Sequence, residues 1–100
     1  MDTDSSDLTI ADVVESIAGR DKGHLFYVLE TDRDYVLLAD GKQRRIEKPK
    51  RKKIKHTVKV LRSETRVAQK LRSGDKVLNS ELRRDLAYLS RELQSNTTGG

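Results

Sequence analysis

Apolar residues in the first part of the chain occur in short runs that polar turns separate. Residues 25–29 and 35–39 are uninterrupted runs of five apolar residues, rich in strand formers. A further segment over residues 11–17 is followed by Gly19, and apolar and charged residues alternate within residues 55–61. Four or five short strands in succession, joined by tight turns, predict a small barrel or a strongly bent sheet.

Turns and a returning strand are expected around the second apolar run. Residues 31–34 are polar and predict a turn. Asp40 and Gly41 follow the second run directly, and Asp-Gly between strands favours a type I′ hairpin turn, in which both central residues have positive φ. Residues 43–48 are then expected to form the returning strand, which Pro49 ends.

From Ser63 onward the spacing of the apolar residues becomes helical. Ser63 is expected to cap a first helix and Gly74 to end it. Asn79 or Ser80 is expected to cap a second helix. Its leucines recur at spacings of four, three and four residues: Leu82, Leu86, Leu89 and Leu93. We expect this stripe to pack on the β-domain; a contact with another molecule is the alternative.

The chain is therefore expected to divide into four segments. These are a disordered acidic lead over residues 1–9, a barrel over 10–62, a helical segment over 63–95 and a disordered tail over 96–100. The predicted fold class is mainly β, a small β-barrel followed by two short C-terminal α-helices.

Charge is distributed unevenly along the 100 residues, although the net charge is only +5. Residues 1–40 carry three bases and ten acids, residues 41–72 carry fourteen bases and two acids, and residues 73–100 carry four of each. The middle block has a net charge of +12, which favours a polyanion as its partner. An ordinary solvated face is the alternative.

The sequence contains little that would support catalysis. Zero cysteines exclude disulfides, thiolate nucleophiles and Cys-ligated zinc. His24 and His56 lie 32 residues apart without suitably spaced carboxylates, and no hydrolase, P-loop or zinc-protease motif occurs. We expect no cofactor, no metal and no enzymatic activity. The acidic start and the short apolar runs predict a cytoplasmic protein that does not bind membranes.

Nine bases within residues 42–55 are the candidate contacts to a phosphate backbone. They are Lys42, Arg44, Arg45, Lys48, Lys50, Arg51, Lys52, Lys53 and Lys55. Pro49 keeps the residue before it extended, and an extended basic segment can follow a phosphate backbone. His56 lies beside the run and is a further candidate for contact with RNA. A nuclear import signal is the alternative interpretation.

A second candidate lies between the first two expected strands. Gly19 and Gly23 are four residues apart with charged residues between them, which predicts a tight loop with positive φ at one or both glycines. The loop either presents Arg20 and Lys22 to phosphate or is only a hairpin connection. The residues alone do not decide between the two.

Several segments, in their order along the chain, resemble the KOW motif and its continuation. They are residues 13–23, Phe26, Val28, residues 35–42, Arg44, Arg45, residues 48–53, Lys55 and His56. The chain is similar to the KOW-domain RNA-binding proteins of bacteria, which are relatives of KOW-containing ribosomal proteins of the archaeal and eukaryotic large subunit. The segment after the barrel in the bacterial group is also similar, at Lys70, Leu71, Ser73, Gly74, Lys76, Val77, Asn79, residues 81–83 and Leu86. The resemblance covers about residues 11–90.

The resemblance implies an SH3-like β-barrel that binds RNA, in particular ribosomal RNA of the large subunit. Gly23 matches the central glycine of the motif, and Arg20 and Lys22 match its basic loop positions. Gly19 and Gly41 are expected to shape the loops. Ribosomal proteins are further expected partners, and we expect a monomer. The alternative function is an adaptor that binds proteins of the ribosome or the transcription machinery.

Overall fold

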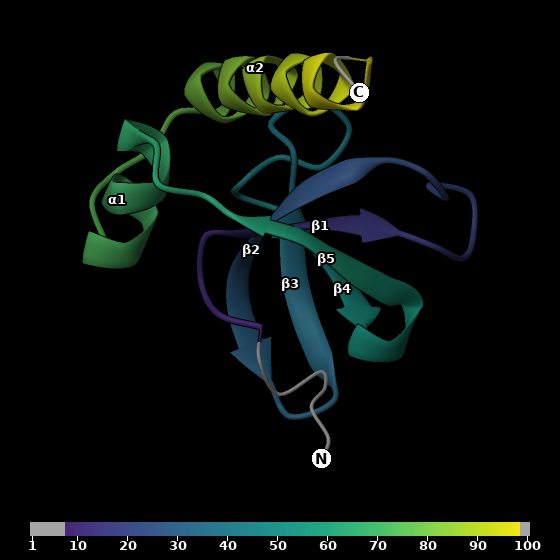
Figure 1. Ribbon diagram of the computed structural model, residues 1–100. Helices are drawn as coiled ribbons and strands as arrows, with labels where there is room; N and C mark the ends of the chain where they lie inside the picture. The colour runs from purple at the N-terminus through teal and green to yellow at the C-terminus, as the bar shows by residue number, and fades with distance from the viewer. Residues whose placement is uncertain (1–7, 99–100) are drawn as a thin grey trace.

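The computed structural model describes residues 8–98, which form an open five-stranded antiparallel sheet followed by two helices (Figure 1). The elements are β1 (Asp12–Ser16), β2 (Leu25–Asp32), β3 (Tyr35–Ala39), β4 (Lys50–Lys53), the 3₁₀-helix η2 (Ile54–His56), β5 (Thr57–Arg62), α1 (Arg66–Ser73) and α2 (Asn79–Thr98). The predicted order of strands first and two helices last is confirmed. The fold is α+β, however, since α2 alone spans 20 residues.

The strand order is β4-β3-β2-β1-β5, so β4 and β5 are the edges of the sheet. No ladder joins these two edges within residues 8–98, and the expected closed barrel is therefore not formed. The three residues of η2 connect the two edge strands instead.

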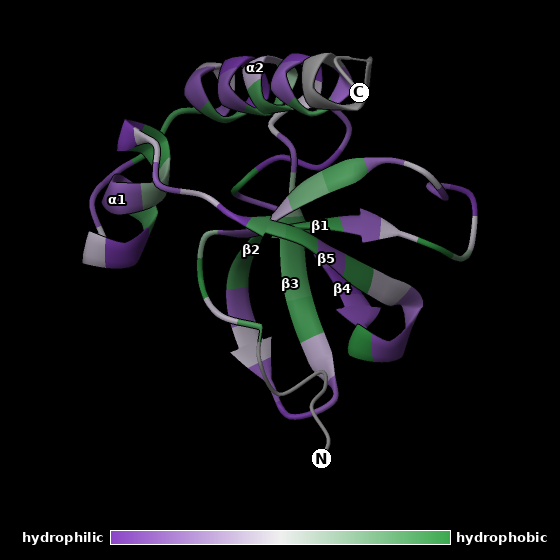
Figure 2. Cartoon of the chain, viewed as in Figure 1, coloured by the Kyte–Doolittle hydropathy of each residue, from purple (hydrophilic) through white to green (hydrophobic). Residues whose placement is uncertain are grey.

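Each face of the sheet carries a cluster of buried residues, which explains why its central strands are uninterrupted apolar runs (Figure 2). The inner core lies on one face and contains Leu8, Val14, Phe26, Val28, Val36, Leu38 and Ile54. The outer core lies between the other face and the helices and contains Ala11, Val13, Tyr27, Ala39, Ala68, Leu82, Leu86 and Leu89. Three leucines of the predicted stripe, Leu82, Leu86 and Leu89, thus pack on the β-domain as predicted, and Leu93 is half-buried.

The predicted returning strand over residues 43–48 is wrong, as is the two-residue turn before it. Residues 40–49 form a loop, and β4 begins only at Lys50, directly after Pro49. Backbone groups of the loop are hydrogen-bonded within the loop. The Asp40 carboxylate accepts hydrogen bonds from the backbone N–H groups of Lys42 and Arg44, at 2.9 Å each. These groups are therefore not available for a ladder with β3.

The helix ends differ slightly from the prediction. Thr65, not Ser63, caps α1, since its Oγ1 accepts a hydrogen bond from the backbone N–H of Ala68 at 3.2 Å. Gly74 ends α1 with a φ of 78°, as predicted. The inner core already includes Leu8, which falls in the predicted lead; residues 1–7 and 99–100 lie outside the described residues. No helix within residues 8–98 is both long and apolar enough to cross a bilayer.

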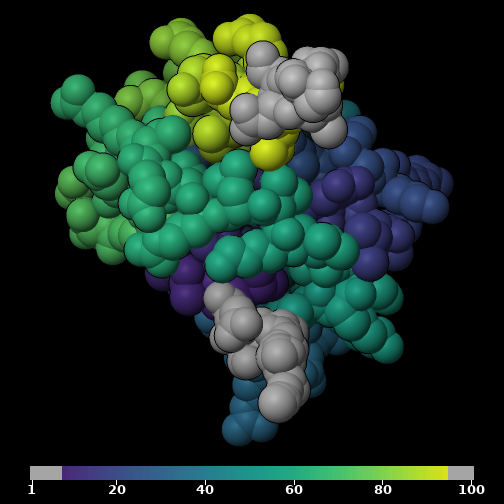
Figure 3. Space-filling view, in the orientation of Figure 1, coloured from purple at the N-terminus to yellow at the C-terminus, as the bar shows by residue number. Residues whose placement is uncertain are grey.

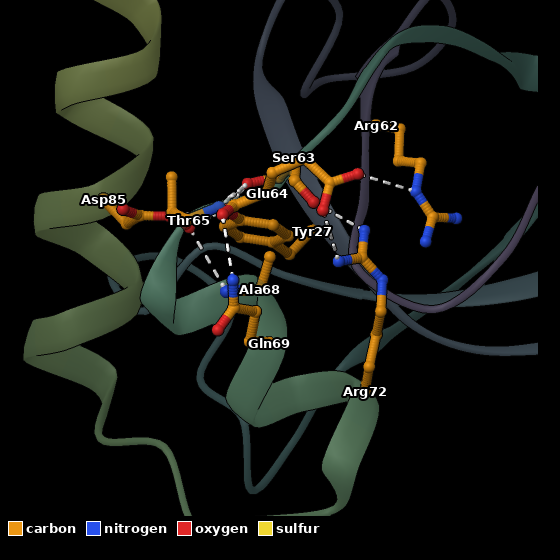
Figure 4. Close-up of polar contacts among 9 residues, drawn as sticks. All are labelled: Tyr27, Arg62, Ser63, Glu64, Thr65, Ala68, Gln69, Arg72 and Asp85. Atoms are coloured by element: carbon orange, nitrogen blue, oxygen red, sulfur yellow. Dashed lines mark hydrogen bonds and ion pairs between the residues drawn. The ribbon is translucent and has the colours of Figure 1, made fainter.

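Tyr27 connects the sheet to both helices through a cluster of buried and half-buried polar side chains (Figure 4). Its hydroxyl donates to the Asp85 carboxylate of α2 and lies 2.8 Å from the Ser63 hydroxyl. The Thr65 hydroxyl also donates to Asp85, at 2.8 Å. In the space-filling view (Figure 3), β5 and the linker to α1 cover this side of the molecule below α2. The position of both helices is thus fixed by hydrogen bonds as well as by apolar packing.

The buried phenol of Tyr27 gives a pH-dependent prediction. Burial, together with the hydrogen bond to Asp85, raises the pKa of Tyr27 from 10.0 to about 12. The stabilisation that depends on the neutral phenol is therefore complete below pH 10 and is lost as the pH rises through 12. We expect Tyr27→Phe to remove an ionisation near pH 12 from a titration followed by tyrosinate absorbance. An unchanged titration curve would contradict this assignment.

Candidate nucleic-acid interface

The alternation of side chains along β4 divides the basic run between two faces of the sheet. Lys50 and Lys52 lie opposite Leu38 and Val36 of β3, two residues of the inner core. Directly opposed residues on neighbouring strands share a face, so both lysines lie on the inner face. Lys52 is buried accordingly, which is unusual for a residue in a run of four bases.

The intervening bases lie on the outer face. Arg51 is opposite Leu37 and Lys53 is opposite Tyr35, and both basic side chains are exposed. The guanidinium carbon of Arg51 lies 3.5 Å from the centroid of the Tyr35 ring. The outer face of β4 therefore presents its charges to solvent, whereas on the inner face Lys52 is buried and Lys50 is half-buried.

The two inward lysines bind Asp21, which lies in the loop between β1 and β2. Lys52 Nζ is 3.0 Å from Asp21 Oδ1 and donates to the backbone carbonyl of Ala18 at 2.9 Å. Lys50 Nζ is 3.2 Å from Asp21 Oδ2, and the Ser16 hydroxyl donates to Asp21 Oδ1 at 2.7 Å. We call these four side chains the Asp21 clasp (Ser16, Asp21, Lys50 and Lys52). It attaches the β1–β2 loop to β4.

The clasp keeps Asp21 ionised. Burial by itself would raise the pKa of this carboxyl group, but the hydrogen bonds from Ser16, Lys52 and Lys50 together outweigh burial and hold the pKa of Asp21 well below its ordinary value of 3.8. Asp21 therefore cancels part of the charge of the two inward lysines. It stabilises the loop and does not act as a proton donor near neutral pH.

The β1–β2 loop presents two bases beside the clasp. Gly19 and Gly23 have φ values of 85° and 91°, as the sequence predicts. The backbone N–H of Gly23 donates to the carbonyl of Ser16 at 2.7 Å and closes the loop. Arg20 and Lys22 are exposed on either side of the buried Asp21. The clasp thus holds two exposed bases close to β4.

The β3–β4 loop presents a second group of exposed bases: Lys42, Arg44, Arg45 and Lys48. The start of α2 holds this loop, since Asn79 Oδ1 accepts from the backbone N–H of Ile46 at 2.8 Å. Arg83 of α2 donates to the carbonyl of Gly41 at 3.1 Å. The contribution of Asn79 and Arg83 could not be predicted from the sequence, because no local pattern links α2 to a loop more than 30 residues earlier.

The last two predicted contacts lie in η2, which follows β4 directly. Lys55 is exposed and His56 is half-buried. The carbonyl of His56 accepts a hydrogen bond from the backbone N–H of Ile17 at 2.9 Å. This bond places η2 at the end of β1, next to the start of the β1–β2 loop.

Nine exposed bases lie on β4 and the segments that adjoin it. Within residues 8–98 none of them forms an ion pair, whereas Lys50 and Lys52 both do. We call them the basic surface: Arg20, Lys22, Lys42, Arg44, Arg45, Lys48, Arg51, Lys53 and Lys55. An arrangement of unpaired cations along an edge strand and two loops is suited to binding a chain of phosphates.

Among the described residues, no three His, Asp or Glu side chains come together as a possible metal site. The chain matches no known protein-family profile and no curated protein. A function for this chain therefore rests on the chemistry of the site itself.

Proposed function

We propose that this protein is a non-catalytic RNA-binding protein that holds structured RNA, such as ribosomal RNA, by its phosphates. The observation that best supports the proposal is the basic surface, whose nine members have no ion pair within residues 8–98. Bases that repel one another destabilise a fold unless a partner neutralises them, and a polyanion does so while releasing its counterions.

We further propose that the sheet is a variant of the SH3-like barrel that the KOW resemblance implies. The two edge strands are joined by only three residues, so the end of β4 and the start of β5 lie close together. Lys52 also reaches from β4 to the carbonyl of Ala18, beyond the end of β1. A sheet whose edges approach in this way must curl around the inner core.

The aromatic residues favour recognition of phosphates and shape over extensive base stacking. Phe26 and Tyr27 are both fully buried, so neither ring is available to a base. Proteins that read single-stranded RNA by stacking use several exposed rings on one surface. A surface with many cations and few rings is better suited to the backbone of a folded RNA.

Removing two bases from the β3–β4 loop is expected to weaken RNA binding. Arg44→Ala combined with Arg45→Ala removes two exposed cations without touching the core or an ion pair. We expect weaker binding to a labelled RNA hairpin and a slope of log Kd against log salt that falls by about 2 between roughly 50 and 200 mM salt. Fluorescence anisotropy at several salt concentrations measures both the Kd and its salt dependence.

A matched control removes two arginines elsewhere. Arg66 begins α1, which lies across the molecule from β4 (Figure 1), and Arg91 is exposed on α2. Arg66→Ala with Arg91→Ala changes the net charge equally and is expected to leave the slope nearly unchanged. If both double variants lower the slope equally, only net charge matters and the proposed surface is wrong. If the wild-type protein ignores RNA but retains a protein partner after nuclease treatment, the adaptor function replaces this proposal.

A further inference from the structure

Arg51 and Tyr35 are in contact on the outer face of the sheet. They come from neighbouring strands, and the guanidinium carbon lies 3.5 Å from the ring centroid. Arg51 is exposed and Tyr35 is half-buried. At this distance the planar guanidinium is in contact with the ring, in a cation–π arrangement.

The polar groups of this pair have no partner within the described part of the chain. Neither the guanidinium of Arg51 nor the hydroxyl of Tyr35 forms a hydrogen bond or ion pair within residues 8–98. A guanidinium stacked on a ring keeps its N–H edge free, and its second face can stack on another planar group. Contact with the ring restricts the orientation of Arg51, in contrast to a freely moving lysine ammonium.

Lys53 places a positive charge beside Arg51 and Tyr35. It lies directly opposite Tyr35 in the β3–β4 ladder, is exposed, and has no ion pair within residues 8–98. Directly opposed residues have neighbouring side chains on one face. A planar stacking surface beside an ammonium group matches a nucleotide, which has a planar base and an anionic phosphate.

We propose that Tyr35, Arg51 and Lys53 form a binding site for one unpaired nucleotide, with its base stacked on the Arg51 guanidinium and its phosphate near Lys53. This inference rests on the proposed RNA-binding function and extends it. The basic surface holds the backbone of a folded RNA, and the site selects RNAs that offer an unpaired base in a bulge or loop. Paired bases are not available to it, because they are stacked within the helix.

The test compares two labelled hairpins that differ only by one bulged adenosine. The wild-type chain is expected to bind the bulged hairpin about tenfold more tightly, which is the size of effect that stacking one base produces. Arg51→Lys retains the charge but lacks the planar group. We expect this variant to lose the preference, measured as the ratio of its affinities for the two hairpins, so that any change common to both hairpins cancels.

Arg45→Lys is the matched control, since it makes the same change at an exposed arginine that has no stacking partner among residues 8–98. It is expected to keep the preference for the bulge. Equal binding of both hairpins by the wild-type chain, or equal behaviour of the two lysine variants, would overturn the site while leaving RNA binding intact. Failure of the wild-type chain to bind either hairpin would overturn the proposed function as well. If Arg51→Lys lowers the melting temperature but leaves the preference for the bulged hairpin unchanged, contact between Arg51 and Tyr35 stabilises the fold and does not bind a base.

Discussion

Replacing Gly41 with alanine is expected to destabilise the protein by roughly 3 kcal/mol or more. A Cβ at Gly41 would lie 2.2 Å from the backbone oxygen of Asn79 and 3.0 Å from the backbone nitrogen of Arg83. Both atoms belong to the first turns of α2, which cannot move aside as a flexible side chain would. Gly41 also has a φ of 77°, which an alanine adopts only with strain. Urea denaturation followed by circular dichroism gives the free energy of unfolding.

Gly74→Ala measures the cost of the backbone strain at a glycine that has no close contact with another segment. Gly74 has nearly the same φ, 78°, but a Cβ there would meet nothing within 4 Å. We therefore expect a loss of only about 1 kcal/mol, from the backbone conformation alone. Similar losses for the two variants would mean that α2 does not rest on Gly41. That result would also contradict the anchoring of the β3–β4 loop by α2.

Breaking the Asp21 clasp is expected to have the second largest effect. Lys52→Met removes an ammonium group that is 3.0 Å from Asp21, and the side chains of both residues are about nine-tenths buried. Removing one partner of a buried ion pair leaves the other charge uncompensated. Lys50 and Ser16 still contact Asp21, so we expect a loss of about 2 kcal/mol in the free energy of unfolding at pH 7, below the full cost of an isolated buried charge.

The pH dependence of this loss follows from the lowered pKa of Asp21. A carboxyl group whose pKa is depressed on folding stabilises the protein above its unfolded pKa, and this contribution is lost as the pH falls through the folded pKa. The wild-type protein therefore gains stability from Asp21 above about pH 4 and loses it in stronger acid. We expect the difference between wild type and Asp21→Asn to shrink as the pH falls below 4. A pH-independent difference would contradict the ionised clasp.

Removing the Asp21 carboxylate is expected to change RNA affinity in the direction opposite to that expected from net charge alone. Asp21→Asn makes the protein one unit more positive, which on net charge alone would tighten binding. Loss of the clasp frees the loop that carries Arg20 and Lys22, so we expect weaker binding instead. Glu30→Gln is the control. The Glu30 carboxylate on β2 is exposed and has no ion pair within residues 8–98, and its removal also makes the protein one unit more positive. Tighter binding by both variants would show that the clasp does not position the loop.

The sequence predicts those features of the fold that local patterns control. The uninterrupted runs at residues 25–29 and 35–39 indicate buried strands, and the structure shows why they do not alternate, since each face of the sheet carries a cluster of buried residues. The positive φ values of Gly19 and Gly23 follow from the short loop between two strands. The leucine stripe of α2 predicts its buried side.

Features that depend on distant residues could not be predicted in this way. The β3–β4 loop is held partly by Asn79, which lies 33 residues beyond Ile46. The register of β4 with β3 places two of the four bases of β4 on each face of the sheet. Lys52 also binds Asp21, which lies 31 residues earlier in the chain. Without that register, Lys50 and Lys52 cannot be distinguished from Arg51 and Lys53. Strand alternation after Pro49 is the only local signal that two of the four bases point inward.

The most direct test of the RNA-binding surface is a map of amide chemical shifts in the full chain as a structured RNA hairpin is added. We expect the largest changes at residues 19–23 and 42–55, with small changes in α1. Binding that shifts mainly α1 and the far half of α2 would contradict the proposed surface. The absence of any shift at low salt would contradict the proposed function itself.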